Sequence, residues 1–271
     1  MRLWKDMTTE DFRVVDAERW VAVLPVAAIE QHGPHLPVSV DTDLAEGVVA
    51  HCMRMAPAEL QAICLPTLCV GKSNEHNCYP GTLSLTINTL LALWTDVAES
   101  VYRSGFRKIV ILNTHGGQPQ AVEIVCRDLR VRLGMLAVAA TYGALGIPEG
   151  LFCAQELQHG IHGGELETSM MLHLRPEAVR MANAKNFVPR SIALEREFDI
   201  LRFEGGGAGF GWMSQDNTAE GTAGDASKAD ADRGRLCIEH AGARLLKIIE
   251  ETSRFPLSRL QGCEQALPGR G

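Results

Sequence analysis

The sequence has no hydrophobic run long enough to cross a membrane. Its longest apolar stretch, residues 21–29, contains Pro25 and falls far short of the roughly 20 residues that span a bilayer. The N-terminal segment MRLWKDMTTEDF has no apolar core and soon becomes acidic, which is typical of neither a secretory signal nor an Arg-rich transit peptide. We therefore expect no membrane partner, and the cytoplasm is the expected compartment.

The sequence also lacks a C-x-x-C pair, although it contains eight cysteines. Scattered cysteines are typical of buried thiols in a reducing compartment, rather than of a disulfide framework or a zinc knuckle. Positive charge is in short supply as well, because 26 Lys and Arg residues face 33 Asp and Glu residues, for a formal net charge of -7. Since proteins that bind a phosphate backbone usually carry a basic face, we expect no nucleic-acid partner and a small-molecule substrate instead.

The composition is that of a folded protein. With 46% hydrophobic and 22% charged residues, the 271 residues are expected to form a single domain, residues 1–271. No tract is biased enough to predict collagen, a coiled coil or disorder. The last segment, residues 256–271, is predicted to be a surface extension.

Strands are predicted to alternate with helices through the first half of the chain. This prediction rests on the spacing of apolar residues, on capping residues and on apolar runs rich in β-forming residues. The expected order is a short helix over residues 8–17, a strand at 20–26, a helix capped by Asp41 or Thr42 that ends before Pro57, a strand at 62–70, a helix over 89–104 capped by Asn88, a strand at 108–112, a helix over 119–133 and a strand at 135–142.

This order predicts an α/β fold with a mostly parallel central sheet and helices on both faces, because parallel neighbours need a helix-length return path. Ligands then belong at the carboxyl ends of the strands. Beyond residue 150 the pattern is less regular, with helices expected over residues 164–174 and 227–251. The glycine-rich loop 205–211 is predicted to be either an active-site or contact loop or a plain connector.

Three groups of potential ligands follow the predicted strands. The first, in AAIEQHGPHLPVSVDTD, contains Glu30, His32 and Asp41. Residues two apart in extended backbone project to the same side, so Glu30 and His32 are expected to face one site, to which Asp41 can supply a bridging carboxylate. The other two groups are His115 in NTHGGQ and, in HGGELETS, His162, Glu165 and Glu167.

Together these groups predict a metal site, although a lone histidine or carboxylate is often a hydrogen-bonded or helix-capping residue. Mixed imidazole and carboxylate ligands suit zinc, manganese or iron, and two ions roughly 3.5 to 4 Å apart that share a carboxylate recur in hydrolytic sites. Two divalent ions would be balanced by Glu30, Asp41, one glutamate of the third group and a bridging hydroxide. We therefore predict two divalent metal ions per chain.

Four motifs resemble those of the creatininase (creatinine amidohydrolase) family. They are EQHGPHLP with Asp41, S-x-E-H with PGTLSL in residues 73–85, NTHGG, and HGGE-x-ETS, in the family's order over about residues 20–175. The resemblance implies a creatininase-like three-layer sandwich, a hydrolase of cyclic amides or related carbon-nitrogen bonds, and a homo-oligomer, commonly a hexamer. It also implies that Glu30, Asp41 and His115 bind one metal, and that His32 and the bridging Asp41 bind the other.

The sequence departs from creatininase itself at three places. Gly117 stands where creatininase has a glutamate ligand, so a ligand of the second metal is expected to be missing; Glu167, or less readily Glu165, could replace it. Ile161 stands where creatininase has a carboxylate, and the tryptophans of its lid are not evident in residues 155–161. These departures favour a family member other than creatininase.

The predicted mechanism is hydrolysis by a metal-bound hydroxide. His162, and Glu167 beside it, are the predicted catalytic residues, with His162 as the proton shuttle or, alternatively, only a hydrogen-bonding residue. His35 is expected to fix its loop. Substrate contacts are predicted for Ser73, Glu75 and His76, which resemble a substrate-side loop of the family and for which the alternative is a structural turn. Gly116 and Gly117 of NTHGG are also predicted to contact substrate.

The predicted substrate is a cyclic amide, a cyclic imide or a formamide. The alternatives are creatinine itself, a peptide that is trimmed, and a scaffold that is stabilised by metal but does not turn over substrate.

Overall fold

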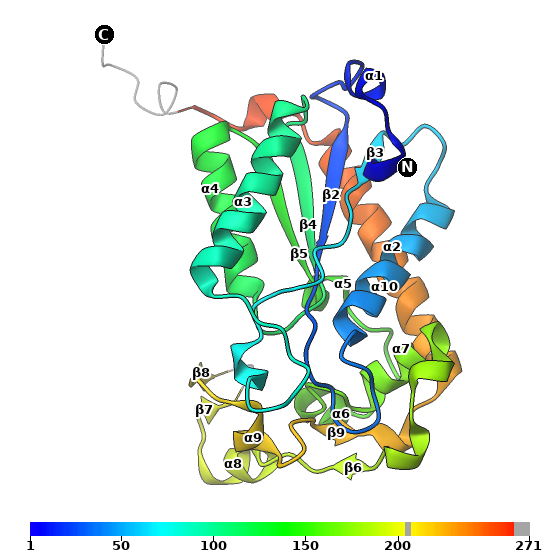
Figure 1. The fold of residues 1–271 in the computed structure, drawn as a ribbon, viewed down its shortest axis with the longest axis vertical. Helices are drawn as coiled ribbons and strands as arrows, with labels where there is room; N and C mark the ends of the chain where they lie inside the picture. The colour runs from blue at the N-terminus through cyan, green and yellow to red at the C-terminus, as the bar shows by residue number, and fades with distance from the viewer. Residues whose placement is uncertain (204–206, 263–271) are drawn as a thin grey trace.

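A five-stranded parallel sheet lies at the centre of the computed structural model, which describes residues 1–203 and 207–262 (Figure 1). The strand order is β1-β3-β2-β4-β5, and every neighbouring pair is parallel. The strands are β1 Arg2–Leu3, β2 Val21–Val26, β3 Ala62–Cys64, β4 Lys108–Asn113 and β5 Leu136–Thr141. The predicted alternation of strands and helices is confirmed, and the short edge strand β1 is an addition to it.

Helices cover both faces of the sheet. On one face α3 Ile87–Arg103 and α4 Pro119–Leu133 pack against a core that includes Trp94 and Phe106. On the other face α2 Val40–Met55, α7 Glu165–Leu174 and α10 Ala231–Arg254 enclose a second core. The expected α/β fold with helices on both faces is therefore confirmed, and none of the described helices is long and apolar enough to cross a membrane.

Smaller elements gather around the carboxyl ends of the strands, at the lower end of Figure 1. The short helices are α1 Thr9–Phe12, α5 Tyr142–Leu145, α6 Ala154–His159, α8 Ser191–Glu197 and α9 Ser214–Asn217, with η2 Asn74–His76 a single 3-10 turn. Two small ladders pair β6 Asn186–Phe187 with β9 Gly224–Asp225 and β7 Leu201–Arg202 with β8 Ala208–Gly209. Of these, α1 lies at the opposite end of the sheet.

Several predicted boundaries were wrong. The first helix ends at Phe12 rather than near residue 17, and β3 stops at Cys64, beyond which Leu68 makes only an isolated bridge to Val26. Because Pro66 has no N–H, it cannot continue a ladder. Helix α10 begins four residues later than expected, after Asp230, whose side chain accepts the N–H of Arg233.

Two predicted helix caps were also wrong. Thr86, not Asn88, caps α3 by accepting the N–H of Thr89 at 3.3 Å. Ser39 precedes α2, so Asp41 lies inside the first turn of the helix. The Asp41 carboxylate therefore does not serve as a cap and is available to the site. The described part of the predicted C-terminal extension begins with a 3-10 turn, Leu257–Arg259, whereas residues 263–271 lie outside the described residues.

A buried lysine joins the sheet to the C-terminal helix. Lys108, the first residue of β4, is 0% exposed, and its Nζ donates to the backbone carbonyls of Glu18 at 2.5 Å, Ser253 at 2.7 Å and Phe255 at 2.7 Å. Two of these carbonyls belong to the end of α10, where carbonyls have no partner within the helix. Burial lowers the pKa of Lys108. The ammonium thus satisfies three carbonyls from two chain segments at once.

Replacing this lysine is expected to destabilise the protein. Lys108→Met would leave the three carbonyls without their donor, at a cost of about 3 kcal/mol in the free energy of unfolding. Lys247→Met removes an exposed lysine of α10 and should change that free energy by less than about 0.5 kcal/mol. Urea titration of both variants measures the difference, and equal effects would contradict the role given to Lys108.

Candidate metal centre

The parallel sheet brings the first two predicted ligand groups together. Strand β4 pairs with β2 along its whole length, with Asn113 opposite Val26 at their carboxyl ends. The chain continues from β2 to Glu30 and from β4 to His115, and α2 returns to the same end with Asp41 in its first turn. All three side chains are buried, with 1%, 2% and 3% of Glu30, Asp41 and His115 exposed.

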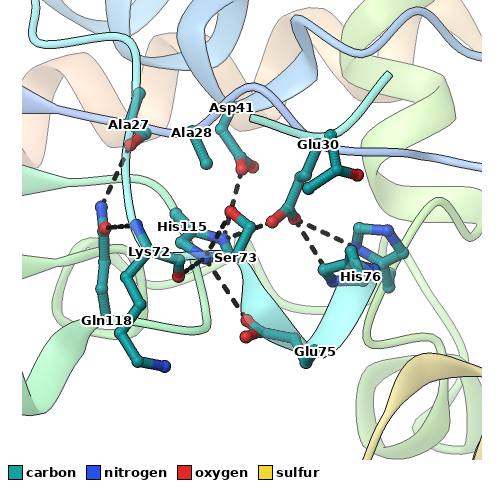
Figure 2. Close-up of polar contacts among 12 residues, drawn as sticks. Ala27, Ala28, Glu30, Asp41, Lys72, Ser73, Glu75, His76, His115 and Gln118 are labelled. Atoms are coloured by element: carbon teal, nitrogen blue, oxygen red, sulfur yellow. Dashed lines mark hydrogen bonds and ion pairs between the residues drawn. The ribbon is translucent and has the colours of Figure 1, made fainter. Parts of the chain in front are cut away.

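These three residues form one possible metal-binding group. His115 Nδ1 lies 3.2 Å from Glu30 Oε2 and 3.3 Å from Asp41 Oδ2 (Figure 2). The other ring nitrogen, Nε2, lies 2.9 Å from the carbonyl of Lys72. Donation from Nε2 to that carbonyl leaves the lone pair of Nδ1 directed at the two carboxylates, which is how metal-binding histidines are usually held.

A second group shares Asp41 with the first. His32 Nε2 lies 3.8 Å from Asp41 Oδ1 and 3.6 Å from Glu167 Oε2. His32 Nδ1 is 3.1 Å from the carbonyl of Glu30, to which it donates, so its Nε2 lone pair faces the two carboxylates. The two oxygens of Asp41 thus face different histidines, an arrangement that suits a bridging ligand.

The unsatisfied polar atoms of the cluster fit a cation. Glu30 Oε2, His32 Nε2 and Asp41 Oδ2 are buried and have no partner that meets hydrogen-bond geometry. Burying such atoms without partners is costly, and divalent ions are favourable partners for carboxylate oxygens and imidazole lone pairs together. The residues present therefore fit bound metal.

Charge and burial shift the pKa values of these groups. Burial and the charge of Glu30 raise the pKa of Asp41 well above its usual range. Burial disfavours the charged form of His115, yet the charge of Glu30 and the adjacent carboxylate of Asp41 raise its pKa well above the usual value. Without metal, the cluster holds protons that a cation would displace.

The third motif contributes Glu167 and His162, but not Glu165. The Glu165 carboxylate accepts a hydrogen bond from Arg233 of α10 and lies outside these groups. Glu167 Oε2 accepts the N–H of Gly163 at 2.6 Å while facing His32. His162 Nδ1 lies 3.6 Å from Glu30 Oε1. Of the two glutamates considered for the second group, the structure brings Glu167 to it.

The predicted substrate loop lies beside His115. Ser73 Oγ is 3.3 Å and Glu75 Oε1 3.5 Å from His115 Nε2, and His76 Nε2 is 3.6 Å from Glu30 Oε1 (Figure 2). Burial, followed by the charge of His162, lowers the pKa of His76 to about 3, so this ring is neutral. The loop is therefore part of the cluster, and its contacts with substrate stay a prediction.

Gly117 is required by the position of Glu75. A Cβ built at Gly117 would overlap Glu75 Oε1 and approach His115 Nε2 to 2.5 Å. The volume above Gly117 is thus occupied by a carboxylate from another segment of the chain.

A cavity of about 380 Å³ opens above these residues. Among the wall residues that sequence reasoning missed are Phe210 and Trp212, which lie in and directly after the glycine-rich loop. Of the interpretations of that loop, the described part favours an active-site loop, while residues 205 and 206 lie outside the described residues. Trp212 is anchored by donating from Nε1 to the carbonyl of Phe203 at 3.1 Å.

His35 fixes its loop, as expected. Its Nε2 is 3.0 Å from Thr168 Oγ1, and the ring stacks on Phe187. Burial lowers the pKa of His35 from 6.5 to about 4.

The protein is expected to lose stability as the pH falls from 6.5 to 4. Over this range His35 becomes protonated in the unfolded chain but stays neutral in the folded protein. This difference lowers the free energy of unfolding by up to about 3 kcal/mol. His35→Gln should remove this contribution, so the loss between pH 7 and pH 4 should be smaller in the variant by that amount. Urea titration at both pH values measures it, and the same loss in both proteins would refute the assignment.

Adding a methyl group at Gly117 is expected to disturb the site. Gly117→Ala should push Glu75 and His115 apart and weaken zinc binding by about 10- to 100-fold. Gly116→Ala is the matched control, because a Cβ at Gly116 meets nothing within 4 Å. Competition with a zinc chelator measures both affinities, and equal affinities for the two variants would show that the overlap is relieved without consequence.

Comparisons with known proteins find similarity along most of the chain. The family model described as creatinine amidohydrolase matches residues 5–249. The mycofactocin precursor peptide peptidase of Mycolicibacterium smegmatis is 32% identical over 161 residues, which are 59% of this chain and 60% of that protein. The creatinine amidohydrolase of Pseudomonas putida is 28% identical over 87% of this chain and 89% of its own.

Solved structures of creatininases have the same fold. A mutant creatininase of Zn-Zn type has a TM-score of 0.72 and 25% identity, covering 92% of this chain and 97% of its own. A protein described as a putative creatinine amidohydrolase from Bacteroides fragilis has a TM-score of 0.74 and 24% identity, covering 94% and 97%. With the family model matched along nearly the whole chain, the protein belongs to the creatininase family.

Proposed function

We propose that this protein is a metal-dependent amidohydrolase that adds water across a carbon-nitrogen bond of a cyclic amide, cyclic imide or formamide. The observation that carries the proposal is the position of Asp41 between two histidine and carboxylate groups. Glu30, Asp41 and His115 would hold one divalent ion, and His32, Asp41 and Glu167 the other. Zinc, manganese and iron all suit these ligands, and creatininases of Zn-Zn and Mn type are known.

Metal ions at this site would lower the pKa of a water molecule to about 7 and polarise the substrate carbonyl. The chain supplies the proton transfer. His162 lines the cavity, and its Nδ1 can accept a proton from the attacking water and return it to the departing nitrogen. The carbon-oxygen bond forms and the carbon-nitrogen bond breaks, so the carbonyl carbon becomes a carboxylic acid and the nitrogen leaves as an amine or, from an imide, as an amide.

A peptide is the second candidate substrate. The relatives that are 32% identical are named mycofactocin precursor peptide peptidases. Phe210, which lines the cavity, is 37% exposed. An exposed aromatic side chain on the cavity wall suits a substrate longer than a single ring. Creatinine is disfavoured because Gly117 and Ile161 differ from creatininase, and a scaffold without turnover would not require this ligand set.

Metal content tests the proposed site. The wild-type protein, purified without chelator, should contain nearly two metal ions per chain, and Asp41→Ala should contain fewer than one, because both groups lose a ligand. Asp43→Ala is the matched control, since Asp43 lies in the same turn of α2 but pairs with Arg175 at 3.1 Å and should leave the metal content unchanged. One ion per chain in the wild type would reduce the proposal to a mononuclear site, and none would refute it.

Turnover tests the proposed activity. The metal-loaded protein should hydrolyse a member of a panel of cyclic imides, formamides and short peptides, lose this activity with chelator and regain it with zinc or manganese. Activity that survives removal of the metal would contradict the proposal. Cleavage confined to peptides would select the second candidate.

A homo-oligomer, with a hexamer as its specific form, is also proposed, and the mass of the protein in solution tests it.

A further inference from the structure

The side-chain amide of Gln31 connects two histidines of the cavity wall. Gln31 is 6% exposed and lies between the proposed ligands Glu30 and His32. Its Nε2 is 2.8 Å from His76 Nδ1, 3.2 Å from His162 Nε2 and 2.5 Å from the carbonyl of Gly221. An amide nitrogen has only two hydrogens for these three neighbours, so the network decides which imidazole nitrogens carry protons.

The orientation of the amide is fixed by the backbone. Gln31 Oε1 accepts the N–H of Gly33 at 2.9 Å, so the nitrogen must face the histidines and Gly221. The Gly221 carbonyl can only accept, and it takes one of the two hydrogens. Gly221 has φ +73°, and a Cβ there would lie 2.7 Å from Gln31 Nε2, so glycine is needed for this approach.

His162 cannot take the second hydrogen. Its Nε2 lies 2.6 Å from the backbone carbonyl of Gln31 and must donate to it. A nitrogen that donates to this carbonyl has no lone pair for the Gln31 amide. The unprotonated nitrogen of a neutral His162 is therefore Nδ1, which lies 3.6 Å from Glu30 Oε1.

The second hydrogen consequently goes to His76. Its Nδ1 accepts from Gln31, so the proton of the neutral ring is on Nε2. That nitrogen lies 3.6 Å from the same oxygen, Glu30 Oε1. The two rings stack, with centroids 4.2 Å apart, and both line the cavity. One network thus presents a proton donor and a proton acceptor side by side.

We infer that His76 is a catalytic residue whose Nε2–H donates a hydrogen bond to the substrate carbonyl oxygen as that oxygen becomes negative, and that Gln31 is the positioning residue that holds His76 in this tautomer. The inference rests on the proposed amide hydrolysis, in which charge develops on that oxygen. A donor already directed into the site stabilises this charge without reorganisation. The two stacked rings then have complementary roles: His76 offers the N–H, and His162 offers the lone pair that proton transfer requires.

The tautomer can be measured directly. Nitrogen-15 NMR of histidine-labelled, zinc-loaded protein should show the His76 proton on Nε2. In Gln31→Glu the carboxylate can only accept, so Nδ1 of His76 should become protonated, while the His35 ring, bonded to Thr168, serves as an unchanged internal reference. A wild-type His76 with its only proton on Nδ1 would overturn the inference, and this result does not depend on any substrate.

Activity provides the second test. His76→Phe should lower kcat by about 100- to 1,000-fold with little change in KM, as removal of an oxyanion donor does. His76→Gln, whose amide N–H can replace the ring donor, should stay within about tenfold of the wild type. Equal losses in the two variants would refute the donor role. Absence of turnover by the wild-type protein on every amide would instead refute the proposed function, and the donor role with it, while the NMR result would still decide the tautomer.

Discussion

The shared carboxylate of Asp41 constrains the rest of the site. Asp41 is 2% exposed, and its ion-pair partners are His115 on one oxygen and His32 on the other. A buried carboxylate next to Glu30 is unfavourable unless positive charge accompanies it. Protons do this partly, as the raised pKa values of Asp41 and His115 indicate. Divalent cations would do so fully. The same cations that neutralise the buried carboxylates would also supply the hydrolytic chemistry of the site.

The fold brings the proposed ligands to Asp41 from separate segments. Strands β2 and β4 deliver Glu30 and His115, and α2 delivers Asp41 itself. The remaining group depends on Glu156, whose carboxylate accepts the N–H of Glu165 at 2.6 Å and of Asp225 at 3.0 Å. Those bonds fix the start of α7, the turn from which Glu167 reaches the site. A Cβ at Gly160, Gly164 or Gly224 would crowd or overlap this carboxylate, so these glycines allow its close approach.

The local sequence pattern predicted the sheet and the proposed ligands. It did not predict the contacts that join these ligands to distant parts of the chain. The alternation of strands and helices predicts a parallel sheet, in which the residues that follow each strand lie at the same edge. Residues such as Glu30 and His115 could therefore be selected from the sequence. Gln31 could not, because its role depends on the carbonyl of Gly221, 190 residues away. Trp212 could not be placed either, since its loop has no periodicity. Short-range errors have local causes, such as Pro66 in the predicted strand and Ser39 before α2.

Gly117 shows why a departure from a family motif is not necessarily a loss. From sequence, a glycine in place of a glutamate predicts an empty ligand position. In the structure, Glu75 fills the space that a side chain at 117 would need, and it lies 3.5 Å from His115 Nε2. The carboxylate near His115 therefore comes from the loop before α3 instead of the loop after β4. Because a site is defined by the groups that share a volume, the two positions have to be judged together: a side chain at 117 would overlap Glu75 where it now lies, while the carboxylate of the second metal-binding group comes from Glu167.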